Sequence, residues 1–420
     1  MEGWTKSTIA SIGEIISGST PKTNIAEYWD GDIVWITPSD LSRLNSRYVT
    51  ASDRKISRRG LDSCSAHLVA KNNIVISSRA PIGYLAIPKT DFTTNQGCKS
   101  IKLKEGHSAE FHYYNLLFNI DDLKRVGEGT TFHEISKQYL ENIEISYPSS
   151  YKEQSRIAEI LNSIDQAIEQ TESLIAKYRR IKTGLMHDLL TRGIDEHGNL
   201  RSESTHQFKE SELGRIPVEW EVKSLEDVCE VIQDGTHFSP ATDPSGAYRY
   251  ITSKNIRFGE MDLTDCEFVN ENEHRAIYRR CAVRFGDVLL TKDGANTGNA
   301  CLNPLKEEFS LLSSVALIRG EKDALLNDFI LQFLLSFKTQ KNIKDEMSGN
   351  AITRLTLTKI NALKILLPGF EEQKRIIKRI DSFDQTSRAQ EDQLKKLHLL
   401  KTGLMQDLLS GKVRVKREEN

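Results

Sequence analysis

The sequence predicts an α+β protein: two similar mixed α/β domains separated by two long antiparallel coiled-coil helices, with a pseudo-two-fold internal repeat. Residues 153–190 match residues 372–409 without a gap, with 17 identities in 38 positions. Weaker matches of apolar pattern precede each of these segments. The chain is therefore expected to run as domain, helix, second domain and second helix.

The strongest part of the repeat is a block at the end of each long segment. Residues 182–190 and 401–409 both spell Lys-Thr-Gly-Leu-Met-x-Asp-Leu-Leu. Both segments begin shortly after a proline with a Glu-Gln pair, at Glu153 and at Glu372. A short motif that recurs at both ends of equivalent segments is typical of a duplicated structural unit.

Apolar residues in both long segments recur at spacings of three and four, as in a coiled coil. The first predicted seam is Ile157, Ile160, Ile164, Ala167, Thr171, Leu174, Tyr178, Ile181, Leu185 and Leu189. The second is Ile376, Ile380, Phe383, Thr386, Gln390, Leu394, Leu397, Leu400, Leu404 and Leu408. Each helix would be about 57 Å long at about 1.5 Å per residue. We expect the two seams to pack on each other, with Thr171 and Gln390 fixing the register; ordinary bundle helices are the alternative.

The domains are predicted from short apolar runs between turn residues. Strands are expected at 33–37, 74–77, 83–87, 100–103 and 143–147, with counterparts at 248–252 and 287–291, and helices at 109–118 and 327–337. The predicted parts are 1–150 (first domain), 151–192 (first helix), 193–218 (linker), 219–370 (second domain), 371–410 (second helix) and 411–420 (basic tail). The linker is polar and acidic, so we expect it to be exposed. The tail could fray, contact a polyanion or pack near the first domain.

Composition narrows the class of protein. The 420 residues carry 57 Lys+Arg against 59 Asp+Glu, which excludes a histone-like polycation. We expect no membrane span, because no run of about 18 apolar residues occurs. The six cysteines form no C-x-x-C pair, and the first residues resemble no signal peptide, so we expect a cytoplasmic location and structural cysteines.

This combination resembles the specificity (S) subunit of a bacterial type I restriction–modification system. The resemblance covers nearly the whole chain and rests on the repeated block, on the Glu-Gln-x-Arg-Ile starts at 153–157 and 372–376, and on the domain openings at Trp4 and Trp220. It implies that each domain is a target-recognition domain that reads one half of a gapped, asymmetric DNA target. The helices would set the spacing and dock the other subunits.

The resemblance also implies the partners and their cofactors. Double-stranded DNA, two adenine-N6 modification (methyltransferase) subunits and restriction subunits would be partners, and no membrane would be. This chain would be non-catalytic and would hold no cofactor or metal. S-adenosylmethionine would belong to the modification subunit, and ATP and Mg to the restriction subunit.

Basic segments occur before an equivalent strand in each half. In the first half Arg43, Arg47, Arg54, Lys55, Arg58 and Arg59 lie within 17 residues, with Asp53 as the one acidic residue among them. In the second half the segment contains Arg275, Arg279, Arg280 and Arg284. Such residues can contact phosphates without reading sequence, although a solvated charged face is the plainer alternative.

Base reading requires polar side chains on projecting loops, and such residues follow the predicted strands. Candidates in the first half are Thr20, Lys22, Ser39, Asp40, Ser78, Arg79, Asn95, Gln96, Thr130, Thr131 and His133. Candidates in the second half are Thr236, His237, Ser253, Lys254, Asn255, Lys292, Asp293, Asn296, Ser313, Ser314, Asn350, Thr353 and Arg354. Arg79 and Lys292 occupy nearly matching places. Paired placement makes the loops stronger candidates than any one residue.

Gly184 and Gly403 interrupt otherwise strong helices at a cost of about 1 kcal/mol each relative to Ala. Their repetition indicates a close approach, either of the other helix or of a partner subunit. The candidates for partner docking or helix pairing are Leu174, Tyr178, Gly184, Leu185, Met186, Leu394, Leu397, Gly403, Leu404 and Met405.

A search for catalytic motifs finds no phosphate-binding loop, no methyltransferase pocket motif and no convincing metal-spaced histidines. Two other functions remain open. A coiled-coil adaptor whose end domains bind proteins would explain the helices, and a stand-alone DNA-modifying enzyme is disfavoured by the missing motifs. Salt-sensitive DNA binding would separate the adaptor from a DNA-recognition subunit.

Overall fold

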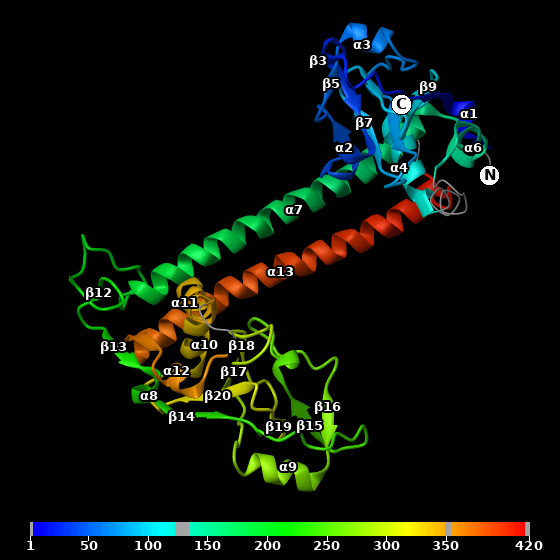
Figure 1. Ribbon diagram of the computed structural model, residues 1–420. Coiled ribbons are helices and arrows are strands. Elements are labelled where there is room, and N and C mark those ends of the chain that lie inside the picture. Colours follow the sequence, from blue (N-terminus) through cyan, green and yellow to red (C-terminus); the bar gives the residue numbers. More distant parts are fainter. Residues whose placement is uncertain (1–2, 122–133, 349–353, 416–420) are drawn as a thin grey trace. The chain divides into compact units, whose positions relative to one another are not determined.

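The computed structural model describes residues 3–121, 134–348 and 354–415 (Figure 1). Its contacts divide the chain into unit 1, Met1–Ser173 with Asp392–Asn420, and unit 2, Leu174–Glu391. Because both boundaries fall inside long helices, each unit combines one mixed α/β domain with one half of each helix.

The domain of unit 1 contains three small sheets and short helices. Its elements are β1 (Trp4–Thr8), α1 (Ile9–Ile12), β2 (Gly13–Ser17), η1 (Ala26–Tyr28), β3 (Trp29–Ile36), α2 (Pro38–Ser42), β4 (Tyr48–Val49), β5 (Lys55–Ile56), α3 (Arg58–Asp62), β6 (Ile74–Ser77), β7 (Leu85–Pro88), β8 (Phe92–Thr94), β9 (Cys98–Leu103), α4 (Ala109–Phe118), α6 (Lys137–Asn142) and β10 (Glu144–Pro148). The strands form the sheets β2-β9-β6-β7-β4, β5-β3-β8 and β1-β10. The first long helix, α7 (Tyr151–Thr191), follows.

Unit 2 contains the second domain. Its elements are β11 (Phe208–Lys209), β12 (Ile216–Pro217), β13 (Glu221–Ser224), α8 (Leu225–Val228), β14 (Cys229–Asp234), β15 (Tyr248–Ile251), η2 (Ser253–Asn255), β16 (Glu267–Val269), α9 (Glu271–Tyr278), β17 (Val288–Thr291), β18 (Ala300–Leu302), β19 (Ser310–Leu311), β20 (Val315–Gly320), α10 (Asn327–Leu335), α11 (Phe337–Ser348), α12 (Leu357–Asn361) and β21 (Lys364–Leu367). The sheets are β14-β20-β17-β18, β16-β15-β19, β13-β21 and β11-β12. The second long helix is α13 (Phe370–Leu409).

The two domains repeat one topology. The antiparallel order β2-β9-β6-β7 corresponds to β14-β20-β17-β18, and the ladder β1-β10 corresponds to β13-β21. The small sheets also match, since β3 runs parallel to β8 as β15 runs parallel to β19. The predicted fold class and the internal repeat are thereby confirmed.

The predicted elements of the domains coincide closely with the observed ones, with one exception. The strand predicted at 74–77 is β6 and the helix predicted at 109–118 is α4. The helix predicted at 327–337 is present as α10, but its predicted end is wrong, because α10 ends at Leu335 and α11 begins at Phe337. Ser336 takes an extended conformation between them, and its hydroxyl accepts a hydrogen bond from Thr339 N (3.3 Å), which caps α11.

The predicted seams of the long helices are correct in period but wrong at alternate positions. On α7 Ile168 and Ile175 are buried, whereas Leu174 and Ile181 are exposed. On α13 Leu400 is exposed. Thr386 is exposed too, and Ser387 and Lys401, each one residue further on, are the less exposed positions. The seam therefore advances by four and three from Ile157 and Ile376, which is the 3.5-residue repeat of a coiled coil.

Two equivalent ion pairs join the helices, one in each unit. In unit 1 Lys401 Nζ of α13 lies 2.7 Å from Asp165 Oδ1 of α7. In unit 2 Lys182 Nζ of α7 lies 2.6 Å from Asp384 Oδ1 of α13. The two lysines, like the two aspartates, occupy the same position of the repeat. Opposite ends of the two helices meet within each unit, so the pair is antiparallel.

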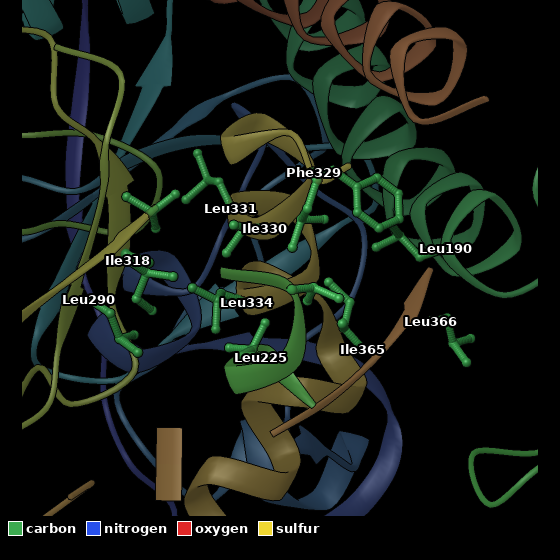
Figure 2. Close-up of a cluster of buried hydrophobic side chains, with 14 of the residues drawn as sticks. Leu190, Leu225, Leu290, Ile318, Phe329, Ile330, Leu331, Leu334, Ile365 and Leu366 are labelled. Atoms are coloured by element: carbon green, nitrogen blue, oxygen red, sulfur yellow. The ribbon is translucent and has the colours of Figure 1, made fainter. Parts of the chain in front are cut away.

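The end of each long helix completes the core of the domain that the other helix begins from. In unit 2 Leu189 and Leu190 of α7 pack in one cluster with Phe329 of α10 and with β17, β20 and β21 (Figure 2). In unit 1 Leu408 and Leu409 of α13 belong to the equivalent cluster. Each fully buried leucine contributes roughly 1.5–3 kcal/mol.

The repeated glutamines attach the helices to the domains. Gln154 Nε2 donates to Pro148 O (2.9 Å), and its Oε1 accepts from Ser108 N (2.9 Å) at the start of α4. Gln373 makes the same pair of contacts with Pro368 O (3.0 Å) and Leu326 N (2.9 Å) at the start of α10. Both side chains are almost fully buried, so the repeated Glu-Gln motif has a structural role.

The segment 193–218 was expected to be exposed, and this expectation is wrong at several positions. Ile194, Arg201 and Ile216 are buried. Arg201 forms a bidentate ion pair with Glu372, which also accepts hydrogen bonds from Ile194 N (3.0 Å) and Trp220 Nε1 (3.1 Å). The acidic composition of the segment gave no sign of this buried pair.

As far as residue 415, the C-terminal tail packs near the first domain, which is one of the three alternatives expected for it. Arg414 donates from Nε to Glu153 Oε1 (2.7 Å) and from Nη2 to Glu153 Oε2 (2.8 Å). Val415 packs against the core of unit 1. The basic residues 416 and 417 lie outside the described residues. Among the described residues, no helix combines the length and apolar composition needed to cross a bilayer.

Candidate nucleic-acid interface

In unit 1 the predicted polar loops meet at one edge of the domain, where β2, β3, β6 and β8 end. Ser19 N donates to Thr94 O (2.9 Å), Asn95 N to Ile36 O (3.0 Å), and Ser78 N to Gly97 O (2.8 Å). A Cβ on Gly97 would lie 2.9 Å from Pro38 Cγ, so the loops are tightly packed. We call this surface the loop edge of unit 1, formed by residues 18–22, 37–43, 78–79, 95–97 and 134.

The loop edge of unit 2 has the same construction, at the ends of β14, β15, β17 and β19. Thr236 N donates to Leu311 O (2.8 Å), and Ser313 N donates back to Thr236 O (2.9 Å). Lys292 N donates to Ser314 O (2.9 Å), which adds a third loop. It consists of residues 235–238, 252–255, 292–296, 312–314 and 354.

Glycine is required where the first loop of each edge passes the strand beside it. A Cβ on Gly18 would lie 2.1 Å from Asn95 O, and one on Gly235 would lie 1.8 Å from Leu311 O. Any side chain at either position would force the loops apart. The Ser-Gly and Asp-Gly dipeptides that end β2 and β14 thus permit the edge to close.

Two of the predicted base-reading residues have structural roles instead. Asp40 is buried, accepts from Thr37 N (2.9 Å) in a capping box, and accepts from Asp53 N (2.9 Å). Asn255 is buried at the equivalent place, where its Oδ1 accepts from Thr252 N (3.0 Å). The side-chain oxygens of both residues accept hydrogen bonds from backbone N–H groups at the turns that follow β3 and β15. The prediction of base contact is therefore wrong for both.

Burial removes three more candidates from direct base reading. Ser78, Thr236 and Lys292 are each at most 2% exposed. Lys292 Nζ lies 3.3 Å from Asp234 Oδ2 and 3.2 Å from Asp293 Oδ2, so its charge is compensated inside the domain. The sequence showed them as polar residues after strands and could not show that they point inward.

The basic segment of unit 1 does not form a free positive surface. Arg43, Arg58 and Arg59 form ion pairs with Asp53, Asp62 and Glu27 respectively. The guanidinium of Arg54 lies 3.5 Å above the ring of Trp29, and Lys55 is exposed. Arg43 belongs to the loop edge, and Lys55 pairs with Val34 near the end of β3. Arg54 and Arg59 instead lie beside Trp29 and Glu27, at the other end of that strand.

The prediction of a phosphate contact is wrong for Arg47, which belongs to that segment. Its side chain is 8% exposed, and it binds Tyr114, Asn162 and Asp165, the last at 2.9 Å. The arginine thereby ties the loop before β4 to α4 and α7. Its charge is used inside the protein and cannot meet a phosphate.

The remaining candidates are at least partly accessible. At the loop edges these are Thr20, Lys22, Ser39, Arg79, Asn95, Gln96, His237, Ser253, Lys254, Asp293, Asn296, Ser313, Ser314 and Arg354, and beside them Arg279 and Arg280. Thr20 donates to Gln96 Oε1, and His237 Nε2 lies 3.2 Å from Asp234 Oδ1. A side-chain hydrogen bond to Glu267 raises the pKa of Lys254. Thr130, Thr131, His133, Asn350 and Thr353 lie outside the described residues.

Equivalent backbone hydrogen bonds align the two loop edges. Ile135 N donates to Ser78 O (2.9 Å), and Leu355 N donates to Lys292 O (2.8 Å). Ser78 therefore corresponds to Lys292. The expected match of Arg79 with Lys292 is shifted by one residue, and Arg79 corresponds to Asp293.

An ion pair occurs at the aligned positions in both units, with its charges exchanged. Arg79 Nε donates to Glu134 Oε2 (2.8 Å). Arg354 Nε lies 2.9 Å from Asp293 Oδ1. Glu134 and Arg354 correspond, just as Arg79 and Asp293 do. Sequence reasoning missed Glu134, and also the buried Lys99 beside it (3.4 Å), because neither lies in a basic run.

The candidate docking residues on the helices divide into three groups. Leu185, Met186, Leu404 and Met405 pack against the cores of the domains, and Tyr178 makes an edge-to-face contact with Phe383 (5.4 Å). Leu394 and Leu397 are half-buried on the seam, and Leu174 is exposed. A Cβ on Gly184 or on Gly403 would meet nothing within 4 Å. Close approach of the other helix at these glycines is therefore wrong.

No described group of three or more His, Cys, Asp or Glu side chains could hold a metal ion. The six cysteines are free thiols. Burial raises the pKa of Cys229, Cys281 and Cys301 to about 12, so these thiols stay protonated at neutral pH.

Comparisons with known proteins match almost the whole chain. The family described as "Type I restriction modification DNA specificity domain" matches residues 1–177 and 217–399. The specificity subunit of the type I restriction enzyme MjaIX from Methanocaldococcus jannaschii is 29% identical, over 98% of this chain and 94% of that protein. The specificity subunit of EcoR124I/EcoR124II from Escherichia coli is 30% identical over 38% of this chain and 40% of that protein.

Solved structures share the fold over the full length. The crystal structure of a type I restriction–modification S subunit from M. genitalium has a TM-score of 0.57 at 20% identity, with 97% of this chain and 96% of that chain covered. The HsdS subunit from Thermoanaerobacter tengcongensis has a TM-score of 0.53 at 18% identity, with 98% of each chain covered.

Proposed function

Because the chain belongs to the type I restriction–modification DNA specificity family and is a specificity subunit, we propose that its two domains each read one half of a gapped, asymmetric target in double-stranded DNA. The observation that carries this proposal is the pair of loop edges. One scaffold is built twice, with equivalent strands, glycines and caps, yet its accessible side chains differ between the copies. Two such surfaces in one chain can read two different sequences.

Specificity subunits are not enzymes, and we propose that this chain acts through partners. Two modification subunits would transfer a methyl group from S-adenosylmethionine to adenine N6, and restriction subunits, which need ATP and Mg, would join them. The complex would act on DNA in the cytoplasm. The modification subunits would dock on the long helices, where Gly184 and Gly403 leave open space on the surface.

The helices would also set the distance between the half-sites. They contain 41 and 40 residues and carry reciprocal lysine–aspartate pairs. An ion pair between the helices favours this register, because any other register would separate the two charges. The length of the gap would follow from this register.

The test is to co-express the chain with its modification subunit and map N6-methyladenine in the host genome. We expect one gapped motif with two defined halves. Replacing residues 1–148 by the same region of a relative should change one half only. If the complex forms and no new methylation appears, the proposal fails, and an adaptor that binds proteins becomes the better explanation.

A further inference from the structure

The charge-exchanged ion pairs each join a half-exposed arginine to a less exposed carboxylate. The side chains of Arg79 and Arg354 are 48% and 45% exposed, and their partners Glu134 and Asp293 are 25% and 28% exposed. In the pair of Arg43 with Asp53, by contrast, both side chains are more than half exposed. In both units a half-exposed arginine is thus held by a mostly buried carboxylate at the same place of the loop edge.

This geometry leaves part of each guanidinium available. Both arginines meet their carboxylate through Nε, so the pair does not use the edge formed by the two terminal Nη groups. A carboxylate on one side of the planar fork restricts its orientation before a ligand arrives. It also compensates the positive charge, which weakens indiscriminate attraction to phosphates.

We propose that Arg79 and Arg354 are specificity-determining residues, each of which reads one guanine in the major groove of its half-site, while Glu134 and Asp293 hold them in position. The inference rests on the proposed function. Guanine is the base that presents two acceptors, O6 and N7, to a planar pair of donors. The target should then contain a guanine read by the first domain and another read by the second.

The exchange of charge also explains how one scaffold can read two sequences. The arginine stands on the strand end after β6 in unit 1 and on the facing segment before α12 in unit 2. Facing residues in antiparallel pairing are about 5 Å apart. Successive bases along one strand are about 3.4 Å apart. The two arginines would therefore address different base pairs relative to their domains.

The experiment uses the full chain in complex with its modification subunit and measures the methylated motif and the binding of duplexes changed at single bases. Arg79→Ala should make one G·C pair of one half-site degenerate, with a loss of discrimination on the order of 10- to 100-fold. Arg354→Ala should do the same in the other half only. Arg215→Ala, which removes an arginine of similar exposure (49%) that is paired with Glu203 in the segment after α7, should leave the motif unchanged.

A charge exchange keeps the ion pair and so separates reading from folding. The triple variant Arg79→Asp, Glu134→Arg, Lys99→Ala converts the pair of unit 1 into the arrangement of unit 2. Lys99 is included because it pairs with Glu134 (3.4 Å) and corresponds to Ala316 of unit 2. We expect the complex to form and the guanine preference of that half-site to move or disappear.

Three outcomes would overturn the assignment. They are an unchanged motif in Arg79→Ala, a change at a base pair other than G·C, and uniform weakening of all sequences with a salt slope reduced by about one, which marks a phosphate contact. If the wild-type complex selects no bipartite motif, the proposed function fails together with this assignment. If the wild type selects such a motif and the variants do not alter it, the assignment alone fails.

Discussion

At the scale of single residues, Glu372 shows how much one carboxylate can organise. It accepts four hydrogen bonds, from Arg201, Trp220 Nε1 and Ile194 N, and it lies at the start of α13. The contacts fasten the segment after α7 to the second domain. Buried charges of this kind are costly to leave without a partner.

Removing Arg201 should therefore destabilise unit 2 strongly. Arg201→Met leaves the Glu372 carboxylate buried without its cation, at an expected cost of about 3–5 kcal/mol in the free energy of unfolding. Arg215→Met is the matched control, because its pairs with Glu203 and Glu210 are exposed and should contribute less than about 1 kcal/mol. Urea unfolding measures both. Equal effects of the two substitutions would show that the buried pair carries no special weight.

A buried histidine makes unit 1 sensitive to acid. His112 on α4 is fully buried beside His107, and burial together with that neighbour lowers the pKa of His112 to about 3. The unfolded chain would titrate near pH 6.5. Stability is therefore complete above about pH 6.5 and is lost as the pH falls toward 3, because only the unfolded state takes up the proton.

The expected loss from this residue is about 2 kcal/mol at pH 5. His112→Gln should cost stability at pH 7.5 through lost packing, and that deficit should shrink by about the same amount at pH 5. Urea unfolding of both proteins at the two pH values tests the prediction. A deficit that does not change with pH would refute it.

At the scale of elements, the two reciprocal ion pairs of the long helices differ in how many further contacts their aspartates make. Asp165 Oδ2 accepts from Arg47 Nη1 (2.9 Å) and Tyr114 OH (2.7 Å), in addition to its contact with Lys401. Its counterpart Asp384 pairs with Lys182. Both units therefore have the ion pair between the helices, and of the two described pairs only that of unit 1 also connects its aspartate to the domain, through Arg47 and Tyr114.

Asp165→Asn should cost about 3 kcal/mol or more, because it leaves the buried Arg47 without its anion. Asp384→Asn, at the same position of the repeat, should cost less than about 1 kcal/mol, since Lys182 and Asp384 are partly exposed. Thermal unfolding followed by circular dichroism compares the two variants. Equal melting temperatures would mean that the link to Arg47 does not stabilise the protein.

At the scale of the whole molecule, each unit is assembled from two distant stretches of chain. Unit 1 needs residues 392–420, because Leu408 and Leu409 lie in its core and Arg414 binds Glu153. A Cβ on Gly3 would lie 3.2 Å from Arg414 Nη2, so the end of the described chain lies beside its start. Chain order and spatial order thus differ.

A rearranged chain tests this organisation. A protein that runs from 392 to 415 and continues through a short linker into 3–173 should fold as one unit with a cooperative urea transition. The fragment 1–173 alone should aggregate, because the apolar surface that Leu404, Leu408 and Leu409 cover would be exposed. Size-exclusion chromatography and circular dichroism distinguish the two. A soluble, cooperative 1–173 fragment would show that the second helix is dispensable for this domain.

The sequence by itself determined the internal repeat, the two long helices, most strands and the placement of polar loops after those strands. These features depend on local periodicity and on turn residues between apolar runs, and both can be read from spacing. The family resemblance followed from the same repeated motifs. The predicted loop positions, among them Arg79 and Arg354, indeed lie at the loop edges.

Only the tertiary structure decided which side chains of those loops are accessible and which helix positions form the seam. Adjacent apolar residues such as Leu174 and Ile175 fit either phase of the repeat, and packing against the second helix selected Ile175. Asp40, Arg47 and Lys292 are polar like their neighbours, yet partners far along the chain bury them. The sequence does not show whether water or an opposite charge will compensate a charged side chain, because folding alone brings the oppositely charged partner close.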